Sequence, residues 1–182
     1  GAFLQYSAFA KTNPSFEVFH YDVSISPNIK DRSFSGKTTI QVKATAEGTE
    51  ELRFPINKLS IERVIVGGNE TLFKVEKEDL IIKLPKRLQV NESAEAKISY
   101  TGGPAPGINF GQTYFYTAYF TCHWMICLEE PFPKASIILR IKVPESYRTV
   151  ASGKLLRETL SSEKTKESVW EQKRPYSTYL FG

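Results

Sequence analysis

The chain has 182 residues, 41% of them hydrophobic and 24% charged, which is the composition of a globular protein rather than a disordered one. The sequence contains no apolar run near the roughly 20 residues that a membrane-spanning helix needs, so no membrane span is predicted. The net charge of +4 comes from scattered lysines rather than a clustered basic patch, so no nucleic-acid partner is predicted either.

The first predicted elements are two long strands that form a hairpin. Residues 16–26 (FEVFHYDVSIS) alternate with a period of two, and residues 34–45 alternate in the same way. The segment 28–32 supplies the turn between them. One face of the pair is expected to be buried and the other wet. In the first strand one set of alternate side chains is expected on the same face: Phe19, Tyr21, Val23 and Ile25.

The same period of two continues along the rest of the chain. Strands are predicted in eight further segments: 51–56, 60–68, 71–77, 80–85, 94–102, 113–120, 136–144 and 147–153. A last hairpin is predicted from 155–160 and 167–172, joined by a polar loop. No segment above ten residues has a helical period, and Pro131 and Pro133 exclude a helix interior where acidic residues cluster. The sequence therefore predicts an all-β protein, a β-sandwich or curved pair of sheets with mostly antiparallel strands.

The two cysteines, Cys122 and Cys127, lie five positions apart. In a continuous strand their side chains would point to opposite faces, so a disulfide between them would need a turn. We expect two buried thiols instead, because free cysteine is often buried. A zinc site formed from these cysteines and His123 would lack the fourth ligand of a structural site, so no metal ligand is predicted.

The common catalytic patterns do not occur in the sequence. It contains neither the H-E-x-x-H motif of helical zinc proteases nor the G-x-S-x-G motif of serine hydrolases. Glu129 and Glu130 are adjacent, so in extended chain their carboxylates face opposite ways instead of forming an acid/base pair. His20 is expected to be a half-exposed histidine in a strand. We therefore predict no catalytic residue in this chain.

Residues 123–144 (HWMICLEEPFPKASIILRIKVP) resemble the signature of the amino-terminal domain of zinc aminopeptidases of the aminopeptidase N and leukotriene-hydrolase family. The family pattern runs approximately R-x-W/F-x-P-C-x-D-x-P-x-x-K-A, followed by an alternating strand that ends in proline. The opening hairpin and the tail VWEQKRPYSTYLFG are also similar to the family, in the right order. The positions that match the signature are Trp124, Cys127, Glu129, Pro131, Lys134 and Ala135.

This resemblance implies a saddle-shaped β-sandwich domain at residues 16–182, preceded by an extension at residues 1–15. It implies a non-catalytic domain of an enzyme that removes amino-terminal residues from peptides. In the family this domain caps the active site and lines part of the substrate pocket, while a separate catalytic domain carries H-E-x-x-H. The expected partners are therefore that catalytic domain and a peptide substrate of the parent enzyme. Zinc is expected in the catalytic domain and outside this chain.

One family position with a role in the substrate pocket differs in this sequence. In the family, a glutamine about twelve residues before the signature cysteine reaches the pocket for the first side chain of the substrate. Counting back from Cys127 gives Phe115, with Tyr116 next, whereas the nearest glutamine is Gln112. If the pocket role is kept, an aromatic floor at Phe115 or Tyr116 favours an apolar first residue. The alternative for both positions is a core aromatic side chain on a strand.

A second interpretation of the whole chain is a free-standing β-sandwich module for binding or adhesion. It would need a natural chain end after Gly182. The apolar ending YSTYLFG argues against that end, because an apolar strand at a cut end leaves unpaired edge surface. We therefore expect an amino-terminal domain separated from its catalytic domain at the domain border.

Overall fold

The computed structural model describes residues 15–129 and 135–176, and this part of the chain is built almost entirely of strands. One short 3-10 helix, η1 (Thr121–His123), interrupts them. The all-β prediction is therefore confirmed. The strands are β1 (Phe16–Asn28), β2 (Ser33–Ala44), β3 (Thr49–Pro55), β4 (Ser60–Val66), β5 (Asn69–Glu70), β6 (Phe73–Glu76), β7 (Asp79–Leu88), β8 (Ser93–Gly102), β9 (Ile108–Phe110), β10 (Phe115–Thr117), β11 (Ala135–Pro144), β12 (Lys154–Leu160) and β13 (Thr165–Tyr176).

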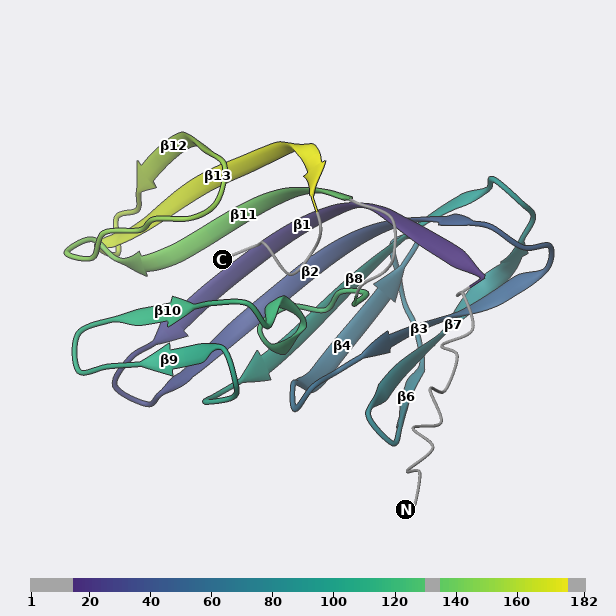
Figure 1. Cartoon of the computed structure of the whole chain (residues 1–182), viewed down its shortest axis with the longest axis horizontal. Coiled ribbons are helices and arrows are strands. Elements are labelled where there is room, and N and C mark those ends of the chain that lie inside the picture. Colours follow the sequence, from purple (N-terminus) through teal and green to yellow (C-terminus); the bar gives the residue numbers. More distant parts are fainter. Residues whose placement is uncertain (1–14, 130–134, 177–182) are drawn as a thin grey trace, which may run out of the picture.

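A large sheet of eight strands forms the body of the molecule (Figure 1). Its order is β12-β13-β11-β1-β2-β8-β4-β5, and β3-β7-β6 and β9-β10 form two smaller sheets. The predicted hairpin of β1 and β2 is confirmed, with antiparallel pairing along its whole length. The pairing is antiparallel throughout except between β1 and β11, which are parallel. The prediction of mostly antiparallel strands is therefore also confirmed.

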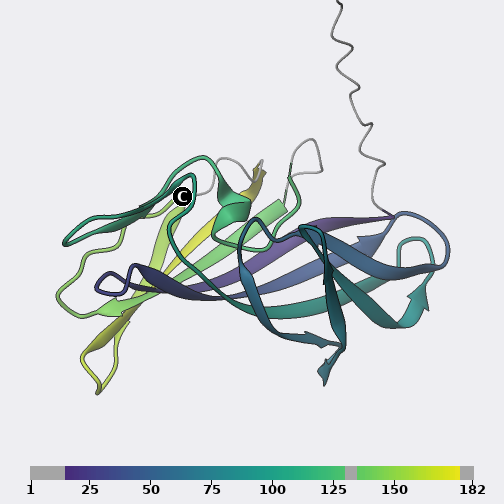
Figure 2. The same cartoon turned by 90° about the horizontal axis from the view of Figure 1, so that it is seen from below.

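The two smaller sheets are joined to the large sheet through aromatic rings. The ring of Phe54 in β3 lies 5.4 Å from that of Phe16 in β1, measured between ring centroids. Phe115 in β10 lies 6.1 Å from Phe34 in β2. Figure 2 shows the hairpin of β9 and β10 together with η1 on one side of the large sheet. These layers bury a single hydrophobic core, which is what a β-sandwich requires.

A β-bulge in β1 changes which side chains of this strand are buried. The register with β2 shifts between Val18 and His20, so one extra residue stands opposite the partner strand. Tyr21 is therefore buried on the same side as Val18, while Phe19 is 42% exposed. The expectation that Phe19 shares the buried face of Tyr21 was wrong, because simple alternation takes no account of a bulge.

Two predicted strands differ from the structure. Residues 147–153 form no strand, because both edges of the preceding β11 are already occupied, by β1 and by β13. In the segment 113–120 only β10 is a strand, and Tyr119 has a positive φ of 65° that ends the extended backbone. Its antiparallel partner β9 was not predicted from the sequence.

Candidate functional site

The stretch that carries the family signature folds as a buried corner against the large sheet. It starts with η1 and continues without regular structure to residue 129. Its buried side chains are Thr121, Cys122, Trp124, Met125, Ile126, Cys127 and Leu128. Pro131 and Lys134, the other predicted signature residues, lie outside the described residues, as does Glu130. The corner is therefore part of the core as far as the structure describes it.

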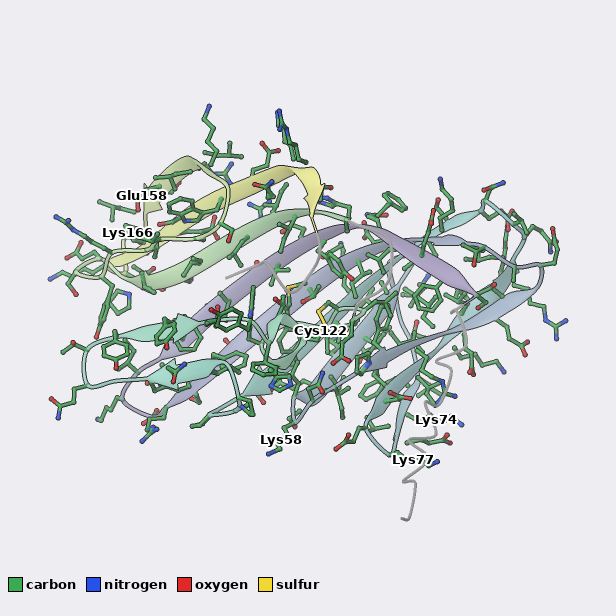
Figure 3. All side chains as sticks on the ribbon, in the orientation of Figure 1. Lys58, Lys74, Lys77, Cys122, Glu158 and Lys166 are labelled. Carbon is green, nitrogen blue, oxygen red and sulfur yellow. A yellow bond between two sulfur atoms is a disulfide. The ribbon has the colours of Figure 1, made fainter. Side chains whose placement is uncertain are left out.

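Cys122 and Cys127 form a disulfide, which corrects the expectation of two free thiols. The turn of η1 supplies the bend that a continuous strand lacks and brings the two Cα atoms to 5.2 Å. That separation is ordinary for a disulfide. Figure 3 shows Cys122 near the middle of the molecule. The disulfide closes the corner, so neither sulfur is available as a nucleophile or a metal ligand.

Two buried tyrosine hydroxyls from the large sheet hold the corner in place. The hydroxyl of Tyr21 in β1 accepts a hydrogen bond of 3.1 Å from the backbone N–H of Leu128. The hydroxyl of Tyr100 in β8 contacts the backbone of Ile126 and lies 2.8 Å from the Thr38 hydroxyl. Burial raises the pKa of both phenols well above the ordinary value of 10.0. Both therefore stay protonated at physiological pH and act as fixed hydrogen-bonding groups, not as proton donors in a reaction.

Glu129 is attached to the scaffold by a side-chain amide. The Nδ2 group of Asn57 lies 3.3 Å from Glu129 Oε1 and 3.2 Å from the carbonyl oxygen of Cys122, and it donates to both. Asn57 sits in a turn, where its φ is 45°. Through these hydrogen bonds the half-buried Glu129 connects the end of the corner to the turn after β3. This is a structural task for the glutamate of the signature.

The two histidines lie apart and each has a partner of its own. The Nδ1 atom of His123 donates a hydrogen bond of 2.8 Å to the carbonyl oxygen of Pro106, and its ring stacks on Phe120 with centroids 5.1 Å apart. His20 is half-buried, as expected, and its Nδ1 lies 2.7 Å from Ser136 Oγ. Within residues 15–129 and 135–176 there is no group of three His, Cys, Asp or Glu residues that could hold a metal ion.

The predicted pocket residues Phe115 and Tyr116 are neighbours in β10 and point different ways. Phe115 packs inward, with ring centroids 4.9 Å from Phe110 and 6.1 Å from Phe34. Tyr116 is 52% exposed and lies 6.3 Å from the ring of Tyr114. Only Tyr116 of the two therefore offers most of its ring to another molecule.

Tyr116 is one of four exposed aromatic side chains in residues 114–120. We call this group the aromatic ridge; it consists of Tyr114, Tyr116, Tyr119 and Phe120. Each of the four is more than half exposed, and all four lie within seven consecutive positions. The rings of Tyr114 and Tyr116 are neighbours, and clustered exposed rings mark interaction surfaces more often than isolated ones do. The sequence predicted a strand at 113–120 and did not predict the ridge.

The family model described as Peptidase M1 N-terminal domain matches residues 18–180. No curated protein matches the chain. In the part of the chain that the structure describes, no helix has the length and apolar character needed to cross a membrane.

Solved structures share the fold. The M1 zinc metallopeptidase from Deinococcus radiodurans has a TM-score of 0.82 and 22% identity, over 92% of this chain and 41% of that one. Yeast LTA4 hydrolase in complex with Bestatin has a TM-score of 0.73 and 20% identity, over 92% of this chain and 28% of that one. This chain therefore spans less than half the length of either protein.

Proposed function

The chain belongs to the peptidase M1 N-terminal domain family, and on that premise we propose that it is the non-catalytic amino-terminal domain of a zinc aminopeptidase. The observation that carries the proposal is the family match over residues 18–180. The parent enzyme removes amino-terminal residues from peptides, and its zinc activates the attacking water. The zinc and the residues that bind it belong to a catalytic domain outside these 182 residues.

The aromatic ridge is the surface that docks on the catalytic domain. Four rings that are more than half exposed leave a large apolar area in water. Burying such area is worth about 25 cal/mol for each Å². Contact along the ridge would also close the hairpin of β9 and β10 over the catalytic site. In this way the domain caps the active site without taking part in the chemistry.

Tyr116 lines the pocket for the first side chain of the peptide. Its ring is available, whereas Phe115 is already packed against Phe34 and Phe110. An aromatic ring at this place favours an apolar first residue, because it adds apolar contact and offers no charge to a basic one. The residue preference of the parent enzyme then depends in part on this domain.

The test uses the full-length polypeptide encoded by the gene. We expect H-E-x-x-H in the sequence downstream of residue 182 and hydrolysis of leucine p-nitroanilide with bound zinc. Tyr116→Ala should lower kcat/KM for leucine p-nitroanilide about tenfold, a loss of about 1.4 kcal/mol, and change it less for lysine p-nitroanilide. Phe19→Ala, an exposed aromatic residue in β1, is the matched control and should change neither.

A separate mixing experiment tests the capping role. The catalytic domain, produced alone, should gain activity when this chain is added, and a chain with Tyr114→Ser and Tyr119→Ser should restore less. A gene that ends after residue 182, or a catalytic domain whose activity ignores the added chain, would instead favour the free-standing binding module.

A further inference from the structure

A groove of about 590 Å³ lies between the hairpin of β9 and β10 and the loop that follows β11. Strand β10 forms one wall, and residues 146–151 form the other. The volume falls in the range of pockets that enclose small organic ligands, roughly 300 to 1,000 Å³. Its position on this domain alone means that a ligand could bind without any catalytic partner.

The floor of the groove is a continuous apolar surface of the large sheet. Leu139, Ile141 and Val143 alternate along β11 and so share one face of the strand. Ile25 of β1 stands directly beside Ile141 in the register of the two strands. Rings from β10, including Tyr116, add an aromatic side wall. Apolar and aromatic walls favour a ligand with a flat apolar body.

Two of the residues that line the groove each hold a buried polar atom without a partner. These atoms are Nε1 of Trp124 and Oγ1 of Thr149, and among the described residues only one other buried side-chain atom, Nε1 of Trp170, shares that condition. Trp124 is 2% exposed, so its indole N–H is cut off from bulk water. Buried donors are normally paired, because leaving one unpaired costs stability. Because both atoms are closed to water, a ligand in the groove would reach them only after their side chains turned, and they do not select the ligand.

The charge at the groove selects the kind of acceptor. Of the described residues that line the groove, Arg148 alone is charged, and its side chain is exposed. A guanidinium suits a carboxylate, whose two oxygens accept hydrogen bonds in the geometry that it offers. We propose that the groove binds an aromatic carboxylate, with its ring on the apolar floor and its oxygens toward Arg148. The groove shares Tyr114 and Tyr116 with the surface of the proposed peptidase role, but its proposed carboxylate partner, Arg148, has no part in that role.

The test is isothermal titration of the 182-residue chain with naphthalene-2-acetate as the probe. Its uncharged counterpart, 2-naphthaleneethanol, has the same rings and no carboxylate. We expect one acid molecule per chain, and about tenfold weaker binding of the alcohol, because hydrogen bonds to a charged group are worth about that factor. No binding of the acid up to its solubility, or equal affinity of acid and alcohol, would overturn the proposal.

Variants locate the site within the molecule. Arg148→Gln should weaken the acid about tenfold and leave the alcohol unchanged, while Arg157→Gln, an exposed arginine of β12 outside the groove, should change neither. Equal effects of Arg148→Gln and Arg157→Gln would place the probe elsewhere and refute this site.

Discussion

Replacing Tyr100 by phenylalanine tests whether the buried hydroxyls hold the signature corner. The ring stays in the core, where Tyr100 is 1% exposed, so the change removes one oxygen and creates little cavity. The Thr38 hydroxyl, 0% exposed and 2.8 Å away, loses this partner, and the backbone contact to Ile126 is lost too. A buried polar group without a partner costs about 1–3 kcal/mol. We therefore expect Tyr100→Phe to lower the free energy of unfolding by about 1–3 kcal/mol.

Urea unfolding at 25 °C, monitored by tryptophan fluorescence, measures this change in the free energy of unfolding. The matched control is Tyr119→Phe, because Tyr119 is 78% exposed; its effect should stay within about 0.5 kcal/mol. Adding Thr38→Val to Tyr100→Phe removes both hydroxyls together. The double variant should then lose less stability than the sum of the two single variants, by about 1 kcal/mol.

Either of two results would refute this reasoning. If Tyr100→Phe were as stable as the parent, the hydrogen bonds of the Tyr100 hydroxyl would make no net contribution to the free energy of unfolding. If the two single effects simply added, Tyr100 and Thr38 would not be coupled, and the corner would be held by packing alone.

Three further predictions concern the disulfide, one glycine and one turn. Cys127→Ala opens the disulfide loop of about six residues and should lower the free energy of unfolding by about 2 kcal/mol. With a reductant present throughout the urea titration, the parent protein should be no more stable than this variant. Gly36→Ala should destabilise by about 1–3 kcal/mol in the same titration, because its new Cβ would overlap the Tyr100 ring; an unchanged midpoint would contradict this. Two hydrogen bonds lower the pKa of Glu92. The stronger effect comes from the backbone N–H of Gln89, and the weaker one comes from the side chain of Lys86. That stabilisation exists above the ordinary glutamate pKa and fades as pH falls through the lowered one, so Glu92→Gln should differ from the parent at pH 7 and converge with it in acid.

Much of the fold follows from the sequence because the strand signal is local. The alternation of residues 34–45 identifies β2 without knowledge of any partner, since one face of the strand must be apolar. The same holds for the hairpin of β12 and β13. The order Trp124, Cys127, Glu129 also indicated the family before any geometry was known, and the family match agrees with it.

Other features were decided only by the tertiary structure, because they depend on residues distant in the chain. Residues 147–153 alternate like a strand but find no open edge, since β1 and β13 already flank β11. The bulge in β1 depends on pairing with β2 and turns Phe19 outward. Spacing alone did not reveal the disulfide, because it needed the turn of η1 between Cys122 and Cys127. Local alternation in the sequence determines which segments are able to form strands, and pairing across the sheet determines which of them do so.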